Sequence, residues 1–277
     1  MVFGAVKRSL RGIDNARRDF RTISEAKVDL CHKGQTRIGV HLHAFYEESS
    51  KLAVERLSFL PPINELIITG EDVQLNEYLH QLALKINSIK NVKLIQTAHG
   101  VKDTEIFIQM VSNSAFDNSH VILKIHGKSM KDHASAQWAR RCIEEIVPSS
   151  EVCEGIIRQL NDCFEPAVAV PKTAVAGFET NAKFVTKLKR TNGRNLLSVG
   201  NSIYPAGSMF WANGIYLEHM RSRIANWNPE YLSGQTRKAE IIERLLFDGI
   251  VLNQSLFTYP SRIQNSCQTK MKDLVTQ

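Results

Sequence analysis

The side chains best suited to chemistry lie together in residues 124–131, which read KIHGKSMK. Lys124 and His126 fall on the same face of a predicted strand, because side chains alternate along a strand. A glycine then allows the backbone to turn, and Lys128 and Ser129 follow. Ammonium groups, an imidazole and a hydroxyl at one strand end are donors that suit a diphosphate. The segment is not a Walker loop, which requires G-x-x-x-x-G-K-[ST]. We therefore expect a diphosphate site here, with a solvated basic turn as the alternative.

Two other patterns have the spacing of metal ligands. His41 and His43 alternate near a strand end, and such a pair can bind one metal ion if further His and Asp ligands join it. We favour the alternative of one core histidine and one surface histidine. Asp103 and Glu105 have the D-x-E form of a carboxylate pair, but Asp103 also precedes a predicted helix, and we favour a helix-capping role. We expect no cofactor, and a divalent metal is an alternative that we do not favour.

The elements that must position these residues alternate between strand and helix. Strands are predicted over residues 37–45, 65–69, 92–97, 120–126 and 167–170, and helices over 51–60, 72–89, 103–111, around Trp138–Ile146 and over 152–164. Apolar strands between amphipathic helices predict an α/β fold with a mostly parallel, Rossmann-like sheet covered by helices. Ligands of such sheets bind outside the carboxyl ends of the strands. Residues 177–202 are polar and are expected to form a loop. No linker or repeat is visible, so we predict a single domain over residues 37–277.

Residues 1–36 have a different character, with eight basic side chains against four acidic ones. Apolar residues recur at helical spacing between residues 3 and 24, which predicts a basic, amphipathic N-terminal helix. Such a helix can lie on an anionic membrane surface. The alternatives are a helix packed on the domain and a disordered leader.

Composition limits the class of protein. The 277 residues are 43% hydrophobic and 23% charged, which excludes a disordered or fibrous chain. No apolar run is long enough to span a bilayer, and the start is not typical of a secretory signal. The five scattered cysteines favour a reducing cytoplasm. The net charge of +7 favours anionic partners, but no element from residue 37 onward combines clustered basic and aromatic residues, so nucleic acid is not expected.

Four sequence blocks follow one another along the chain: HLHAFY at 41–46, LKIHGKS at 123–129, YPAGSMFWA at 204–212, and Asp248-Gly249. In this order and spacing, residues 37–256 resemble the rhamnan synthesis F family of bacterial cell-surface polysaccharide glycosyltransferase-like proteins. The resemblance implies a GT-A-like fold. It also implies transfer of a sugar, such as rhamnose or another deoxyhexose, from a nucleotide-sugar donor to a growing polysaccharide, lipopolysaccharide or lipid-linked glycan. The protein would then be cytoplasmic and peripheral to the inner membrane face.

The resemblance also suggests roles for individual residues. Lys124, His126, Lys128 and Ser129 would neutralise the donor diphosphate without a metal ion, and His126 is an alternative proton donor. Asp248 would be the general base that deprotonates the acceptor.

Other expected contacts lie further from the reacting atoms. Behind Asp248 stand Glu243 and Glu240 as further candidate bases. For the donor nucleotide the candidates are His43 and Asp103. The residues expected to bind the acceptor are Trp138, Arg140, Gly207, Ser208 and Trp211.

Two other functions compete with glycosyl transfer. The family's N-R-G-R-D block is reduced here to HGVKD at residues 99–103, and the histidine of its D-G-T-L-A-H block is replaced by Asn253. These differences favour, as one alternative, a non-catalytic glycan-binding partner of a synthesis complex. The other alternative is a metal-dependent hydrolase that uses His41 and His43.

Overall fold

The computed structural model describes residues 21–22, 35–171, 175–176, 204–205, 208–225 and 256–259. Its main sheet is built from β1 (Arg21–Thr22), β2 (Ile38–Ala44), β3 (Ile63–Gly70), β4 (Val92–Gln96), β5 (Val121–His126), β6 (Val168–Pro171), β9 (Phe210–Asn213) and β10 (Leu256–Tyr259). The helices are α2 (Glu47–Arg56), α3 (Val73–Ala83), α4 (Asp103–Ser112), α5 (His133–Ile146), α6 (Ser150–Asn161) and α8 (Gly214–Ala225), and a 3-10 turn, η1 (Leu57–Phe59), follows α2. Two short strands, β7 (Val175–Ala176) and β8 (Tyr204–Pro205), pair with each other.

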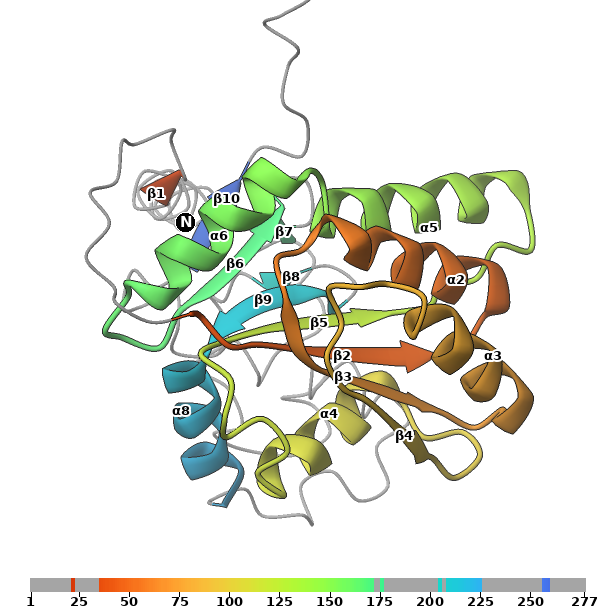
Figure 1. Ribbon diagram of the computed structural model, residues 1–277, viewed down its shortest axis with the longest axis horizontal. Coiled ribbons are helices and arrows are strands. Elements are labelled where there is room, and N and C mark those ends of the chain that lie inside the picture. Colours follow the sequence, from red (N-terminus) through yellow and green to blue (C-terminus); the bar gives the residue numbers. More distant parts are fainter. Residues whose placement is uncertain are drawn as a thin grey trace, which may run out of the picture.

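The described strands of the main sheet are ordered β1-β10-β6-β9-β5-β2-β3-β4 (Figure 1). The chain runs outward from β2 through β3 to β4, and all of these pairs are parallel. It then returns through α4 and places β5 on the other side of β2, again in parallel. The strand β9 is antiparallel to both of its neighbours, β5 and β6. The sheet is therefore parallel except at one inserted strand.

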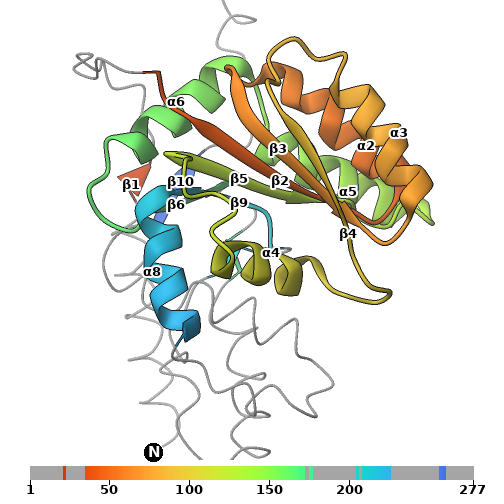
Figure 2. The same ribbon diagram turned by 60° about the horizontal axis from the view of Figure 1, so that its bottom comes forward.

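Helices cover both faces of this sheet (Figure 2). The helices α2, α3, α5 and α6 lie on one face, and α4 and α8 lie on the other. Each face has its own apolar core, and Trp211 belongs to the first and Phe210 to the second. Neighbouring residues of a strand point to opposite faces, so β2 sends Val40 and Leu42 toward the first core and its two histidines toward α4.

The predicted α/β class, with a mostly parallel sheet covered by helices, is confirmed. The helix expected over residues 72–89 ends earlier, at Ala83. Arg21 and Thr22 form a short strand, so a helix over residues 3–24 cannot include them. The other residues of that segment, and the loop expected over residues 177–202, lie outside the described residues. Among the described helices, none is long and apolar enough to cross a membrane.

The expected cap at Asp103 is wrong. The residue that begins α4 as its N-cap is Lys102, whose backbone N–H donates to the Glu105 carboxylate at 3.3 Å. Asp103 is the first helical residue, and its carboxylate contacts the side chain of Lys124 instead of the backbone of its own helix. The carboxylate that would cap the helix is used instead in an ion pair with Lys124, which is distant in the sequence.

Candidate functional site

The polar residues gather where the direction of strand order changes. After β2 the chain turns one way, to β3, whereas β5 lies on the other side of β2. In open α/β sheets such a switch point leaves a crevice at the carboxyl ends of the two strands, because their connections leave to opposite sides. Here β2 ends just before Phe45, and β5 ends at His126. The parallel register places His43 beside His126 and His41 beside Lys124, all on the face that α4 covers.

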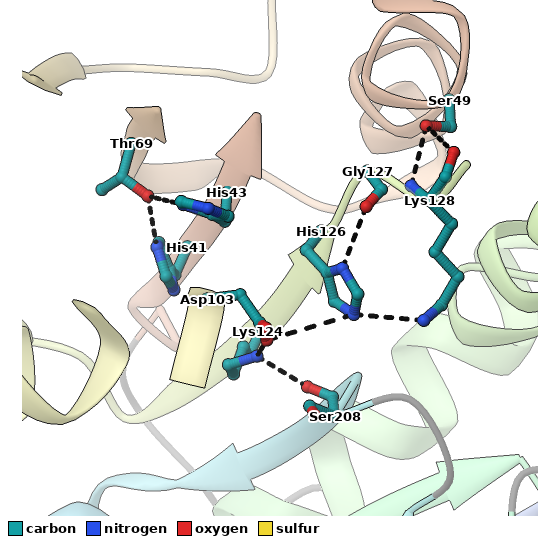
Figure 3. A network of polar contacts seen from close by, with 10 residues as sticks. All are labelled: His41, His43, Ser49, Thr69, Asp103, Lys124, His126, Gly127, Lys128 and Ser208. Atoms are coloured by element: carbon teal, nitrogen blue, oxygen red, sulfur yellow. Dashed lines mark hydrogen bonds and ion pairs between the residues drawn. The ribbon is translucent and has the colours of Figure 1, made fainter. Parts of the chain in front are cut away.

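Lys124 and Asp103 form a buried ion pair at the centre of this site (Figure 3). The Lys124 side chain is fully buried, and its ammonium contacts Oδ2 of Asp103. It also donates a hydrogen bond of 2.8 Å to the backbone carbonyl of Ser208, which lies just before β9. One ammonium thus joins β5, the first turn of α4 and the entrance to β9.

The carboxylate of Asp103 is held in its charged form. Burial works to raise its pKa, but the Lys124 ammonium, the nearby His126 and the hydrogen bond from Lys124 outweigh burial and hold the pKa well below its ordinary value. The side chain is 17% exposed. Asp103 is therefore an anion that is buried on one side and open to water on the other.

His126 and Lys128 extend the network from Asp103 to Trp138. His126 Nδ1 lies 3.0 Å from the Gly127 carbonyl, and its Nε2 lies 3.2 Å from Nζ of Lys128. These contacts fit a ring that donates from Nδ1 and accepts at Nε2 from the ammonium. The same ammonium lies 4.4 Å from the ring centroid of Trp138, which is 50% exposed. The Lys128 side chain is thus buried beyond the carboxyl end of β5, beneath an aromatic ring.

The turn after β5 is fixed against the start of α2. The Ser49 hydroxyl accepts from the Lys128 N–H and donates to the Lys128 carbonyl, both at 2.8 Å. A Cβ on Gly127 would come within 2.5 Å of the Ser50 hydroxyl and 3.1 Å of the Tyr46 nitrogen. Glycine is required here because the two segments approach closely. From the sequence alone, this glycine is explained only by the turn of the backbone.

The two histidines of β2 share one partner. His41 Nε2 and His43 Nδ1 lie 2.9 Å and 2.8 Å from the Thr69 hydroxyl of β3. Burial, the largest effect, lowers the pKa of His43 to about 4, and burial also lowers the pKa of His41 well below its ordinary value. Both rings are buried, so the expected surface histidine is wrong. Thr69 was missed, although its register opposite His43 would have identified it once β2 and β3 were paired.

No group of three or more His, Cys, Asp and Glu side chains in the described part of the chain could hold a metal ion. His41 and His43 each use one ring nitrogen for Thr69, and the carboxylates of Asp103 and Glu105 diverge, one to Lys124 and one to the start of α4. Within the described residues, no further ligands gather around the two histidines, as the hydrolase alternative would require.

The residues expected to bind an acceptor do not share one surface. Trp211 is fully buried in the core, and its indole N–H donates to the Ile146 carbonyl at 2.8 Å, so this prediction is wrong. Ser208 is also buried, with a left-handed φ of 57°, and its carbonyl serves Lys124. Trp138 and Arg140 are exposed on α5, where residues two apart point in different directions.

Four of the predicted site residues lie outside the described residues. They are Gly207, Glu240, Glu243 and Asp248. Ser129 is described and half-buried, directly after Lys128. Of the predicted set, the structure brings together His43, Asp103, Lys124, His126, Lys128, Ser208 and Trp138.

No family model matches this chain, and no curated protein matches it. The resemblance to the rhamnan synthesis F family therefore stays a prediction. Among solved structures, the glycosyltransferase GlyE of Streptococcus pneumoniae TIGR4 is similar with a TM-score of 0.38 and 9% identity, covering 87% of this chain and 50% of that one. A 4-diphosphocytidyl-2C-methyl-D-erythritol synthase is similar with a TM-score of 0.39 and 10% identity, covering 88% of this chain and 100% of that one. The chain thus spans about half the length of the first structure, and both similarities are distant and concern the fold alone.

Proposed function

We propose that this chain is a glycosyltransferase that binds a nucleotide-sugar donor in the crevice at the ends of β2 and β5. The observation that carries the proposal is the row of polar groups from the Asp103 carboxylate through the His126 imidazole to the Lys128 ammonium, at the switch point of a mostly parallel sheet. An ionised carboxylate suits the hydroxyl groups of a sugar, and an ammonium a few ångströms away suits a phosphate. A nucleotide-sugar presents both kinds of group next to each other.

Lys128 is the residue that we assign to the diphosphate, with Ser129 beside it, and His126 holds the Lys128 ammonium in place by accepting a hydrogen bond from it. Lys124 is removed from that role, because its ammonium is enclosed and contacts the Asp103 carboxylate. The Lys128 ammonium contacts the imidazole of His126 and the indole of Trp138. Cationic donors that are fixed before the reaction stabilise the charge that develops on a departing diphosphate. No divalent metal is needed for that step.

The finer parts of the proposal rest on the sequence resemblance. Asp248 is proposed as the general base toward the acceptor hydroxyl, with Glu243 and Glu240 as its substitutes. Trp138, which lies over the Lys128 ammonium, and Arg140, which is exposed on the same helix, are proposed to contact the acceptor glycan. The proposed product is a polysaccharide or lipid-linked glycan extended by rhamnose or another deoxyhexose. Residues 1–36 are proposed to contact an anionic membrane.

The deciding experiment is calorimetric titration of the full chain with UDP, dTDP, GDP and CMP in EDTA. Selective binding of one nucleotide is expected. Lys128→Met should weaken that binding about tenfold or more, since a hydrogen bond to a charged group is worth about 1.5–3 kcal/mol. Lys131→Met is the matched control, because Lys131 is exposed in the same segment, and its affinity should equal that of the wild type.

Three other results of the titration would change the proposal. Binding that appears only with Mn²⁺ would refute the metal-independent mechanism. An equal loss in Lys128→Met and Lys131→Met would place the phosphate elsewhere. No binding of any nucleotide in either condition would make the non-catalytic glycan-binding function the leading one.

A further inference from the structure

We propose that Lys124 is a positioning residue: it holds Asp103 in place as the carboxylate that accepts hydrogen bonds from hydroxyl groups of the bound nucleotide-sugar. This inference rests on the proposed function for the identity of the ligand. Its structural part, the action of Lys124 on Asp103, stands on the contacts of the two side chains alone.

The first observation is the division of labour between the two oxygens of Asp103. Its contacts with Lys124 and His126 all involve Oδ2. Within the described part of the chain, no contact of the carboxylate uses Oδ1, and the side chain keeps 17% of its surface exposed. One oxygen therefore anchors the group, and the other is available to water or to a ligand hydroxyl.

The second observation is that Lys124 cannot reach a ligand. It is fully buried, and its ammonium is enclosed by Asp103, the Ser208 carbonyl and the ring of Phe107, whose centroid lies 5.8 Å away. A buried ammonium is costly unless it is paired, so its place beneath Asp103 ties the carboxylate to β5. The role of Lys124 is thus carried out through Asp103.

The third observation concerns Ser208, which completes the anchor. Its backbone has φ of 57°, a conformation that non-glycine residues seldom adopt, and this turn presents its carbonyl to Lys124. Figure 3 shows Lys124 linked to both Asp103 and Ser208, with His126 joined to the same carboxylate. Three separate elements are therefore arranged around the ammonium so that Asp103 is held at the crevice.

Several charged and titratable groups face Asp103, and the test must account for them. Lys124 and His126 approach from β5, and His41 and His43 lie on β2. Lys128 lies beyond His126. Of these, only the Lys124 ammonium is enclosed against the carboxylate. Its removal should therefore let burial dominate, so that Asp103 takes up a proton at a higher pH.

The structural part is tested without any ligand. In the full chain labelled with ¹³Cγ-aspartate, the resonance of Asp103 is assigned by its loss in Asp103→Asn and is followed from pH 4 to pH 8.5. In the wild type it should remain that of a carboxylate throughout. In Lys124→Met it should titrate within this range, whereas Lys131→Met should behave as the wild type. An Asp103 resonance that is unchanged by Lys124→Met would overturn the positioning role.

The variant Lys124→Met has a built-in control for folding. If it unfolds because an unpaired carboxylate is left buried, then the double variant Lys124→Met/Asp103→Asn should recover a cooperative unfolding transition. If the double variant is as unstable as the single one, the ion pair is not what Lys124 provides, and the inference fails.

The ligand part uses four probes at pH 7: UDP, UDP-glucose, dTDP and dTDP-glucose. Asp103→Asn should weaken binding about tenfold to a hundredfold, the loss expected for a hydrogen bond to a charged group. A loss confined to the glucose-bearing probes assigns the hydroxyls to the sugar, and an equal loss for the bare diphosphates assigns them to the ribose. With the two glucose-bearing probes, whose diphosphate has no terminal phosphate group to titrate, the measurement is repeated from pH 6 to pH 8.5: in Lys124→Met, affinity should rise with pH as Asp103 ionises, whereas the wild type should show no such rise.

The outcomes separate the two proposals. Unchanged affinity in Asp103→Asn would overturn the hydroxyl-accepting role while leaving the nucleotide site intact. No binding of any of the four probes by the wild type would overturn the ligand assignment together with the proposed function. The NMR titration would still decide whether Lys124 acts on Asp103.

Discussion

Acid should destabilise this protein through the buried histidines of β2, in a pH range that the acidic residues do not share. His43 has a pKa of about 4 in the folded protein and 6.5 as its ordinary value, because burial opposes its charge. The unfolded chain therefore binds a proton at a higher pH than the folded one. Stability is fully present above about pH 6.5 and is lost as the pH falls toward 4.

The size of the loss follows from these two pKa values. Each pH unit between them is worth 1.36 kcal/mol, so His43 can contribute at most about 3 kcal/mol. Between pH 7 and pH 4.5 the linkage relation gives a loss of roughly 2 kcal/mol from His43 alone. His41 is shifted in the same direction and adds to the loss. The pKa of Asp103 is also lowered in the folded protein, but the stability that this carboxylate contributes is lost only when the pH falls below about 4.

The measurement is urea unfolding at half-unit steps from pH 7.5 to pH 4.5. His43→Asn replaces the ring with an amide that does not titrate and should flatten the dependence by roughly 2 kcal/mol over that range. His133→Gln, at an exposed position that begins α5, controls for the loss of a histidine as such. A wild-type free energy of unfolding that stays constant from pH 7 to pH 4.5, or an equal slope in His43→Asn, would refute the reasoning.

Three further changes test other parts of the structure. Gly127→Ala should lower the free energy of unfolding by about 1–3 kcal/mol in urea, because its Cβ would lie 2.5 Å from the Ser50 hydroxyl; an unaltered midpoint would contradict the close approach. Trp211→Phe should cost about 1–3 kcal/mol by leaving the Ile146 carbonyl without its donor, with nucleotide affinity unchanged by calorimetry; lost affinity at full stability would return Trp211 to the site. Asp248→Asn should abolish sugar transfer in a donor-turnover assay while nucleotide binding persists, and normal turnover would remove Asp248 as the base.

The parallel half of the fold could be predicted because its signals are local. Apolar runs bounded by turn residues place β2 to β5 within a few residues. Amphipathic segments predict the helices between them, but α2 begins at Glu47 and not at residue 51, and α3 ends at Ala83 and not at residue 89. The direction of β9 could not be predicted in this way, because the side-chain pattern of a buried strand is the same whether its neighbours run parallel or antiparallel.

The site was predictable in composition but not in pairing. The grouping of Lys124, His126 and Lys128 follows from alternation along one strand. That Lys124 would be enclosed by Asp103 and Ser208 depends on contacts 21 and 84 residues away in the chain, which no local pattern contains. The prediction of one surface histidine was wrong for the same reason, since the partner that His41 and His43 share, Thr69, comes from the next strand.

The late position of β9 in the chain has a consequence for synthesis on the ribosome. Strands β2 to β5 can pair as soon as residue 126 has left the exit tunnel, because their contacts lie within that stretch. The other edge of β5 pairs with β9, and the Ser208 carbonyl follows Lys124 by 84 residues. A nascent chain therefore has an incomplete sheet with one unpaired edge until β9 emerges. This edge is the surface that a ribosome-associated chaperone would have to shield.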